Sequence, residues 1–163
     1  MHRDAVLALL SRYARRELAA HEAMMAAETI RFIEENCLWR TQLAGHLTGS
    51  AWVVDARRQR TLLTHHRKLD KWLQLGGHAD GDADLLAVAL REAEEESGLK
   101  RLRAIDREIF DLDRHLIPAR KDEPEHWHFD LRFMIEADPD EPLLITNNPE
   151  ESMARMVRKT SSV

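Results

Sequence analysis

The uneven distribution of glycine and proline most constrains the fold of this chain. The first 44 of its 163 residues contain neither, and all five prolines lie after residue 117. Both residue types interrupt helices, so the N-terminal part is free to be helical, and Val6, Leu10 and Tyr13 follow helical spacing there. We predict one or two helices before residue 40, with a break near Arg16 to Ala20.

After these helices the pattern becomes that of a sheet. Segments 46–55 and 60–65 are short and rich in Thr, Val, Leu and Trp, and they predict two paired strands. Segments 105–112 and 126–135 predict two more strands, with a loop at 118–124 between them. Strands around one embedded helix favour a mixed α/β (α+β) sandwich over a helical bundle.

Composition excludes several classes of function. The net charge of -5 offers no general attraction to nucleic acid or to an anionic membrane surface. No apolar run approaches the ~18 residues of a membrane span. The single cysteine, Cys37, excludes an intramolecular disulfide and a multi-cysteine zinc site. We expect a cytoplasmic protein without a membrane or nucleic-acid partner.

An acidic helix carries the clearest chemical signal. A helical pattern runs from Ala83 to Ser97, between a tight loop at 76–81 that holds Gly76, Gly77 and Gly81 and a helix stop at Gly98. At about 100° per residue, three of its carboxylates share one face. They are Glu92, Glu95 and Glu96.

Crowded carboxylates repel one another, so a divalent cation among them would relieve the conflict. Magnesium prefers hard oxygen ligands and suits a site completed by substrate phosphates. An acidic cluster by itself is usually a solvated helix face. Its combination with the glycine-rich loop and the Gly98 stop favours a metal site.

The segment from Gly77 to Leu99 resembles the Nudix box, G-x5-E-x7-R-E-U-x-E-E-x-G-U, where U is a bulky aliphatic residue. Two positions depart from the pattern: Ala83 replaces the first glutamate, and Ala93 replaces the first aliphatic residue. Segments 45–55, 62–68 and 72–78 are similar to a group of bacterial Nudix hydrolases. The resemblance implies a single domain over residues 1–163, a Nudix-like α/β/α sandwich with a mixed sheet, and an N-terminal helical extension over residues 1–40.

The resemblance also implies an activity and its residues. It implies a Mg²⁺-dependent hydrolase, with Mn²⁺ as a substitute, that cleaves a pyrophosphate bond in a nucleoside diphosphate linked to another moiety. Glu92, Glu95 and Glu96 would be metal ligands, and either Glu92 or Glu95 would be the general base. Arg91 would orient these carboxylates.

Two further ligands follow from the same resemblance: the Gly76 carbonyl oxygen and, from a loop before the last strand, Glu151, with Glu150 as the neighbouring choice. For the lost glutamate at Ala83, Asp82 or Asp84 could reach in, or the remaining three glutamates could suffice. Relatives usually end in a Trp-containing strand and a helix, and we expect neither from segment 156–163.

A His-x-His-x-Asp pattern stands out in the last predicted long strand. His126, His128 and Asp130 alternate, so they share one face of that strand. They could form a second metal site, but two histidines make an incomplete zinc site. We therefore favour the alternative, a polar wall of the substrate cleft.

Four residues are candidates for substrate contacts. Arg67 suits a phosphate by charge, and Trp72 (or Trp127) offers an aromatic face to a base. His78 and His128 are the polar candidates. The simpler alternative is that the tryptophan belongs to the core and that the basic residue is solvated.

Two rival functions remain open at this stage. One is a catalytically weak or inactive Nudix-fold module that binds a nucleotide for regulation, which the loss of a glutamate at Ala83 favours. The other is an interaction protein that associates through its N-terminal helices. A homodimer is the expected assembly from family analogy and from these apolar helices.

Overall fold

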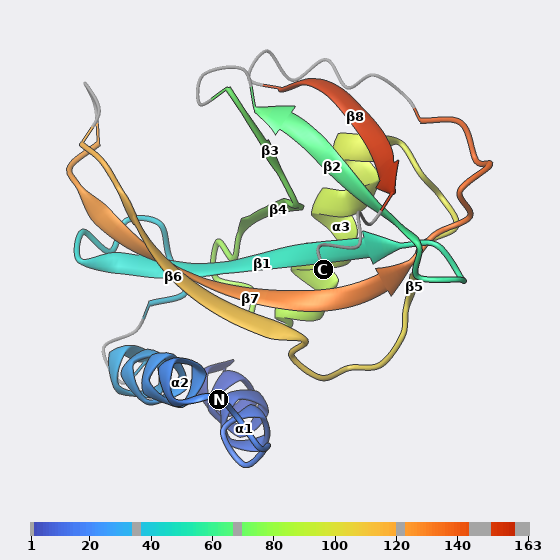
Figure 1. Cartoon of the computed structure of the whole chain (residues 1–163). Coiled ribbons are helices and arrows are strands. Elements are labelled where there is room, and N and C mark those ends of the chain that lie inside the picture. Colours follow the sequence, from blue (N-terminus) through green and yellow to red (C-terminus); the bar gives the residue numbers. More distant parts are fainter. Residues whose placement is uncertain (1, 34–36, 67–69, 120–122, 144–150, 159–163) are drawn as a thin grey trace.

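The structure is a computed structural model that describes residues 2–33, 37–66, 70–119, 123–143 and 151–158, without the side chains of residues 2, 151–155 and 158. Figure 1 shows its elements in chain order, which are α1 (His2–Tyr13), α2 (Ala20–Ile33), β1 (Gly45–Val54), β2 (Arg60–His66), β3 (Lys71–Leu73), β4 (Leu75–His78), α3 (Leu85–Ser97), β5 (Arg103–Ala104), β6 (Asp111–Ile117), β7 (His126–Glu136) and β8 (Glu151–Arg158).

The eight strands within these residues form one mixed sheet. The two longest strands, β1 and β7, run parallel and side by side, and the other pairings are antiparallel. Near the end of β1, where Val54 pairs with Thr61, the chain turns into β2, and β2, β3 and β8 curl away from β1 and β7 (Figure 1). The predicted α+β fold with a mixed sheet is confirmed.

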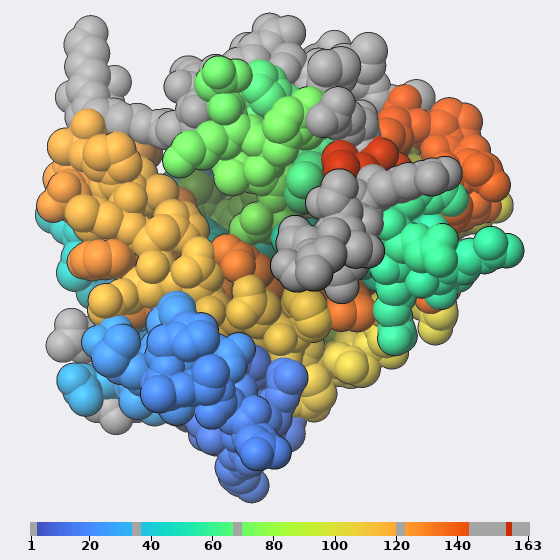
Figure 2. Space-filling view, viewed as in Figure 1, coloured from blue at the N-terminus to red at the C-terminus, as the bar shows by residue number. Residues whose placement is uncertain are grey.

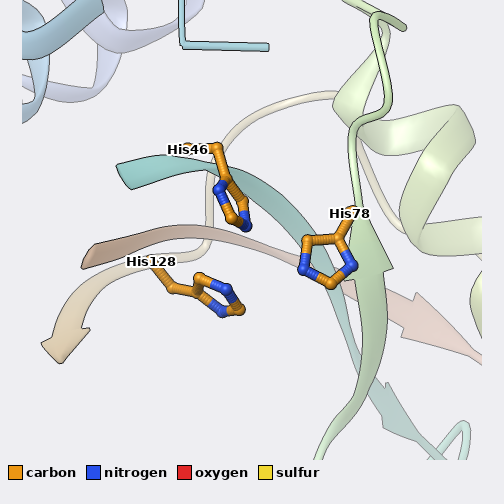
Figure 3. Close-up of side chains that lie close together, drawn as sticks. All are labelled: His46, His78 and His128. Atoms are coloured by element: carbon orange, nitrogen blue, oxygen red, sulfur yellow. The ribbon is translucent and has the colours of Figure 1, made fainter. Parts of the chain in front are cut away.

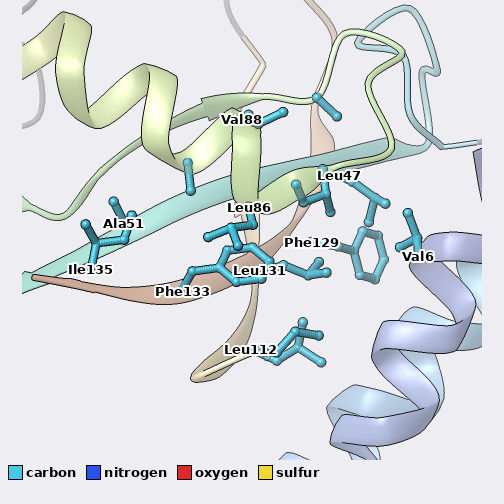
Figure 4. Packing of buried hydrophobic residues seen from close by; sticks show 14 of the residues in the cluster. Val6, Leu47, Ala51, Leu86, Val88, Leu112, Phe129, Leu131, Phe133 and Ile135 are labelled. Carbon is cyan, nitrogen blue, oxygen red and sulfur yellow. The ribbon is translucent and has the colours of Figure 1, made fainter. Parts of the chain in front are cut away.

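The two faces of the β1–β7 pair differ in chemistry. Leu47 lies beside Phe129 on one face, and His46 lies beside His128 on the other. The apolar face is covered by helices: the ring of Phe32 from α2 stacks on Phe129 with centroids 4.1 Å apart, and side chains from α3 join the same core (Figure 4). The polar face is left for a site.

Helix α3 begins and ends where its capping residues dictate. The Asp84 side chain accepts a hydrogen bond from the Ala87 N–H at 3.1 Å, and Gly98 ends the helix with a left-handed φ of 74°. The helix therefore starts two residues later than Ala83, the predicted start. The predicted stop at Gly98 is confirmed.

The prediction of one strand over residues 105–112 is wrong. The chain instead forms β5 and β6 on either side of a turn at 105–110. The Asp106 carboxylate accepts a hydrogen bond from the Glu108 N–H at 2.8 Å, and such a local bond competes with a strand ladder. The apolar Ile109 is buried without belonging to a strand.

Both ends of the chain bear on earlier expectations. Two helices precede residue 40, and the break at 14–19 agrees with the predicted one. Segment 156–163 was expected to supply neither a Trp-containing strand nor a helix. Its first three residues belong to β8, a strand without tryptophan that ends at Arg158 and pairs antiparallel with β2, and the rest lies outside the described residues. The extent of the domain stays a prediction. In the part of the chain described here, no helix has the length and apolar character needed to cross a membrane.

Cys37 is a buried core residue. Its side chain is 1% exposed, and burial raises the pKa of its thiol to about 11. The thiolate is the reactive form of cysteine, so a thiol in this state is inert. Cys37 therefore contributes to packing and not to chemistry.

The contact between α3 and β1 depends on the absence of a side chain at Gly49. A Cβ there would lie 2.6 Å from the Leu85 carbonyl oxygen and 3.2 Å from the Val88 Cβ. Gly49→Ala is expected to lower the free energy of unfolding by about 1–3 kcal/mol, because one of the two elements must move. Denaturant unfolding measures this, with Ala44→Ser as an exposed control that also adds one heavy atom. Equal stability of the two variants would contradict the packing described.

Candidate active site

A cleft of about 400 Å³ opens on the polar face of β1 and β7. The hollow is visible in Figure 2 between β3 and β4, in green, and β6, in yellow to orange. Its lining includes residues of six strands, of α3 and of the segment before β1. The residues used below are Arg40, Thr48, Ser50, Gln74, Gly76, Gly77, His78, Glu92, His115, His126, His128 and Asp130.

Two glutamates of α3 lie directly against β4. The Gly76 N–H donates a hydrogen bond to Glu96 Oε2 at 3.3 Å, and a Cβ on Gly77 would collide with the Glu92 carboxylate. A Cβ on Gly76 would likewise collide with Ser50. These glycines were expected in a tight loop, but they form strand β4. Glycine in a strand often marks a close approach, and here the approach is to carboxylates.

The surroundings of Glu92 disfavour its negative charge. Its side chain is 20% exposed, and Arg91 Nη2 lies 3.2 Å from its Oε1. The pKa of Glu92 is raised above its ordinary value, mainly by burial. The charges of Glu95 and Asp80 also raise this pKa, and the ion pair with Arg91 opposes the rise. Negative charge is thus crowded at the mouth of the cleft, as a site for a divalent cation requires.

Both aspartates that flank the missing glutamate are engaged at the start of α3. Asp84 caps α3 and pairs with Arg107 at 3.0 Å, while Asp82 accepts a hydrogen bond from the Asp84 N–H at 2.9 Å. Ala83 itself packs against the core.

A cluster of histidines fills the other end of the cleft. His46 of β1, His78 of β4 and His128 of β7 point toward one another, and one nitrogen of each lies within 4.8 Å of the other two (Figure 3). His126 lies next to this group, with its ring centroid 4.9 Å from that of His46, and His115 lies 5.5 Å from His128.

The clustered imidazoles are neutral. Burial, together with the charges of the neighbouring histidines, lowers the pKa of His46 to about 4 and that of His128 to about 2. Burial likewise lowers the pKa of His78, and the charge of Arg40 adds to this effect. Near neutral pH, each ring therefore keeps one nitrogen with a free lone pair.

The contacts of His126 fix the position of one proton. His126 Nδ1 lies 2.8 Å from the Pro124 carbonyl oxygen, which can only accept, so Nδ1 of His126 carries a proton. Nε2 of His126 lies 3.2 Å from Nε2 of His128, so these two nitrogens are engaged with each other.

The His-x-His-x-Asp pattern does not act as one unit. The buried Asp130 carboxylate accepts hydrogen bonds from Thr48, Ser50 and Gln74 at 2.8, 2.6 and 3.1 Å, and it pairs with Arg132 at 3.0 Å. Its oxygens are thus occupied on the floor of the cleft. Asp130 supports the cleft and does not join the histidines as a ligand.

A cation also faces the cleft. Arg40 lies between α2 and β1, and its Nε donates to Asp80 Oδ1 at 2.6 Å. Asp80 in turn lies close enough to Glu92 to raise its pKa. Arg40 therefore places positive charge beside the carboxylates, where a phosphate could be held.

Three other residues were predicted from the sequence to belong to the site: Arg67, Trp72 and Glu151. Arg67 lies outside the described residues, as does the side chain of Glu151, whose backbone pairs with that of His66 at the start of β8. The centroid of the Trp72 ring lies 5.2 Å from that of His65. Trp72 is not among the described residues that line the cleft, although its neighbours Leu73 and Gln74 are. The proposed roles of these residues stay predictions.

Two residues of the site escape sequence reasoning. His46 directly follows a glycine at the start of a strand, and Arg40 stands in a segment without any pattern. The contact of His46 with the other histidines depends on strand pairing far away in sequence, which no local spacing reveals. Only the alternation of His126 and His128 signalled a polar face at this place.

Comparisons with known proteins agree with this architecture. No curated protein matches the sequence. Among solved structures, a NUDIX-family hydrolase from Clostridium perfringens is similar, with a TM-score of 0.53 and 20% identity over 69% of this chain and 81% of that one. The Escherichia coli dihydroneopterin triphosphate pyrophosphohydrolase gives 0.51 and 13% over 69% and 80%. A Caenorhabditis elegans Ap4A hydrolase in a binary complex gives 0.50 and 13% over 69% and 79%.

These structures are similar in fold, and the assignment to a family comes from a separate comparison. The model of the NUDIX domain matches residues 45–160, which are more than two thirds of the chain. The match includes β4 with its glycines, the acidic helix α3, and the strands β1 and β7. The chain therefore belongs to the Nudix family of pyrophosphohydrolases.

Proposed function

We propose that this protein is a Mg²⁺-dependent Nudix hydrolase that cleaves the pyrophosphate bond of a nucleoside diphosphate linked to another moiety, with Mn²⁺ able to replace Mg²⁺. The observation that carries the proposal is the pair of α3 glutamates, Glu92 and Glu96, held against Gly76 and Gly77 of β4, with Glu92 lining the cleft. The family assignment supports the same reaction class.

The fold neighbours are consistent with a nucleotide-like substrate. Two of them are hydrolases of Ap4A and of dihydroneopterin triphosphate, and both of these compounds carry linked phosphates. The cleft has room for such a group beside Arg40, and its volume lies within the usual range for small-molecule sites. A small diphosphate compound is therefore the proposed partner, and action in the cytoplasm as a homodimer is part of the proposal.

The residues present fit a hard divalent cation. Glu92, Glu95 and Glu96 would hold it through carboxylate oxygens, with the Gly76 carbonyl oxygen and Glu151 as further ligands. Burial already penalises the charge of Glu92, which such a cation would offset. When bound, Mg²⁺ polarises a phosphoryl group and lowers the pKa of a coordinated water.

The other groups of the site position and activate the reactants. Glu92 is the half-buried carboxylate, so it is the better placed of the two candidate bases, and Glu95 is more exposed. Arg91 orients Glu92 through their ion pair. Arg40, His78 and His128 face the space where the substrate would lie.

A second candidate function is a Nudix-fold module that binds a nucleotide for regulation. The specific observation in its favour is Ala83, because Asp82 and Asp84 are both engaged at the start of α3. A ligand set with one carboxylate fewer would bind the metal more weakly. Measuring both nucleotide binding and hydrolysis distinguishes the two functions, because the regulatory module would bind the nucleotide without cleaving it.

Turnover should depend on Mg²⁺ and on the α3 glutamates that face β4. Across nucleoside diphosphate derivatives, dinucleoside polyphosphates and nucleoside triphosphates, at least one class should be hydrolysed, and phosphorus NMR identifies the bond that is cleaved. Glu96→Gln should lower kcat by roughly 10²-fold or more, because a metal ligand contributes several kcal/mol.

The matched control is Glu94→Gln on the same helix. Glu94 is exposed and pairs with Lys100, away from β4, so its variant should keep full activity. If Glu96→Gln retains metal-dependent turnover, the placement of the site is wrong. If the whole panel is bound but not cleaved, the regulatory module is the better description.

Arg40 should contribute to substrate affinity. A charge-assisted hydrogen bond is worth about 1.5–3 kcal/mol, so Arg40→Gln should raise KM roughly 10-fold or more with a smaller effect on kcat. Arg12→Gln is the control, since Arg12 also pairs with an exposed carboxylate, that of Glu108, on a different part of the surface. An unchanged KM in Arg40→Gln would remove Arg40 from the substrate site.

A further inference from the structure

The histidine cluster is assembled by strand register. His46 and His128 are direct neighbours across the parallel β1–β7 pair, and His78 lies opposite Thr48, the next residue of β1 on the same face. Neighbouring side chains on one face of a sheet lie about 4.5–5.5 Å apart at Cβ. Three imidazoles from three strands are therefore brought to one spot by the backbone itself.

His46 has no hydrogen-bond partner in this cluster. The residue is 3% exposed, and neither Nδ1 nor Nε2 completes a hydrogen bond of normal geometry within the described chain. A weak hydrogen bond with the Gln42 backbone, which opposes the lowering of the His46 pKa, can serve only one of the two nitrogens. Buried polar groups in proteins are nearly always satisfied, and an exception calls for an explanation. The imidazole of His46 faces the rings of His78 and His128, so the missing partner belongs among them (Figure 3).

From these observations we infer that His46, His78 and His128 form a binding site for a transition-metal cation of the Zn²⁺ class, separate from the carboxylate site of α3. Neutral imidazole is a preferred ligand of Zn²⁺, Co²⁺ and Ni²⁺, whereas Mg²⁺ prefers oxygen. One bound ion would satisfy a nitrogen of all three rings, including the one that the fold leaves without a partner.

The distances suit such an ion after a small adjustment. Zn–N bonds of about 2.0–2.1 Å place tetrahedral ligand atoms roughly 3.4 Å apart. The three nitrogens already lie within 4.8 Å of one another, so the side chains would have to bring them closer by about 1.4 Å at most. His78 is half-buried and borders the open cleft, which leaves it free to make this adjustment.

The surroundings of the cluster resemble the outer shell of a metal site. A metal-bound histidine usually donates its other N–H to a neighbour, which sets its tautomer. Nε2 of His128 lies 3.2 Å from Nε2 of His126, and His126 is in turn held by the Pro124 carbonyl oxygen. A metal bound to Nδ1 of His128 would leave its Nε2–H to donate to His126. His126 is thus a positioning residue.

Three protein ligands leave a coordination position open. His78 and His128 both line the cleft, so that position faces the space assigned to the substrate. A site with three histidines and an open position can bind a water or a substrate oxygen. The inference itself rests on the histidines alone, and it stands whether or not the protein hydrolyses a diphosphate.

The test is Co²⁺ titration of the metal-free full-length protein, followed by visible absorption and by calorimetry. One equivalent of Co²⁺ should bind with the spectrum of a nitrogen-ligated ion, and excess Mg²⁺ should leave that spectrum unchanged. Loss of a residue that only supports a metal ligand weakens binding 10- to 100-fold. His46→Gln and His78→Gln each remove a ligand itself, so each should weaken Co²⁺ binding by at least this much. His78→Gln keeps the test decisive if the buried His46→Gln variant does not fold.

Two control variants locate the ion. Glu96→Gln should bind Co²⁺ as the parent does, and so should His115→Gln, which removes a histidine of the same cleft that lies outside the ligand group. Displacement of Co²⁺ by Mg²⁺, or a loss confined to Glu96→Gln, would place the ion on the carboxylates and overturn the inference. An equal loss in His115→Gln would indicate a diffuse histidine patch and would overturn it as well.

Discussion

The parallel pairing of β1 with β7 is the interaction on which the rest of the structure depends. Its register sets Leu47 beside Phe129 on the face that the helices cover, and His46 beside His128 on the face that stays open. A slip of one residue would exchange these faces, because side chains alternate along a strand. Core and cleft are therefore two consequences of one register.

Close backbone approach then connects the sheet to the acidic helix. Gly49 of β1 lets α3 lie on the sheet, and Gly77 of β4 lets the Glu92 carboxylate reach the rim of the cleft. Side chains at either position would separate the helix from the strands. The glycines thus determine where the negative charge of α3 is placed, and the Nudix spacing from Gly77 to Glu92 expresses this geometry in the sequence.

Local signals predicted much of this structure, and contacts between distant segments account for what was missed. Helix α3, its Gly98 stop and the strand β7 follow from short-range periodicity and capping. The turn at Asp106 was missed because a side-chain hydrogen bond overrides strand propensity there. The grouping of His46 with His78 and His128 joins three strands, and a single sequence without a fold does not contain that information.

The two metal sites that we propose for this cleft differ in the element that carries each ligand set. Carboxylates come from α3, where one turn of helix brings hard oxygen ligands together, and imidazoles come from the sheet, where register does the same for nitrogen ligands. Asp130 lies on the same face as the histidines, yet its oxygens are saturated by Thr48, Ser50, Gln74 and Arg132. A carboxylate with all its lone pairs in use does not compete for a cation. The two proposed ligand sets can therefore share one small cleft and still select different ions.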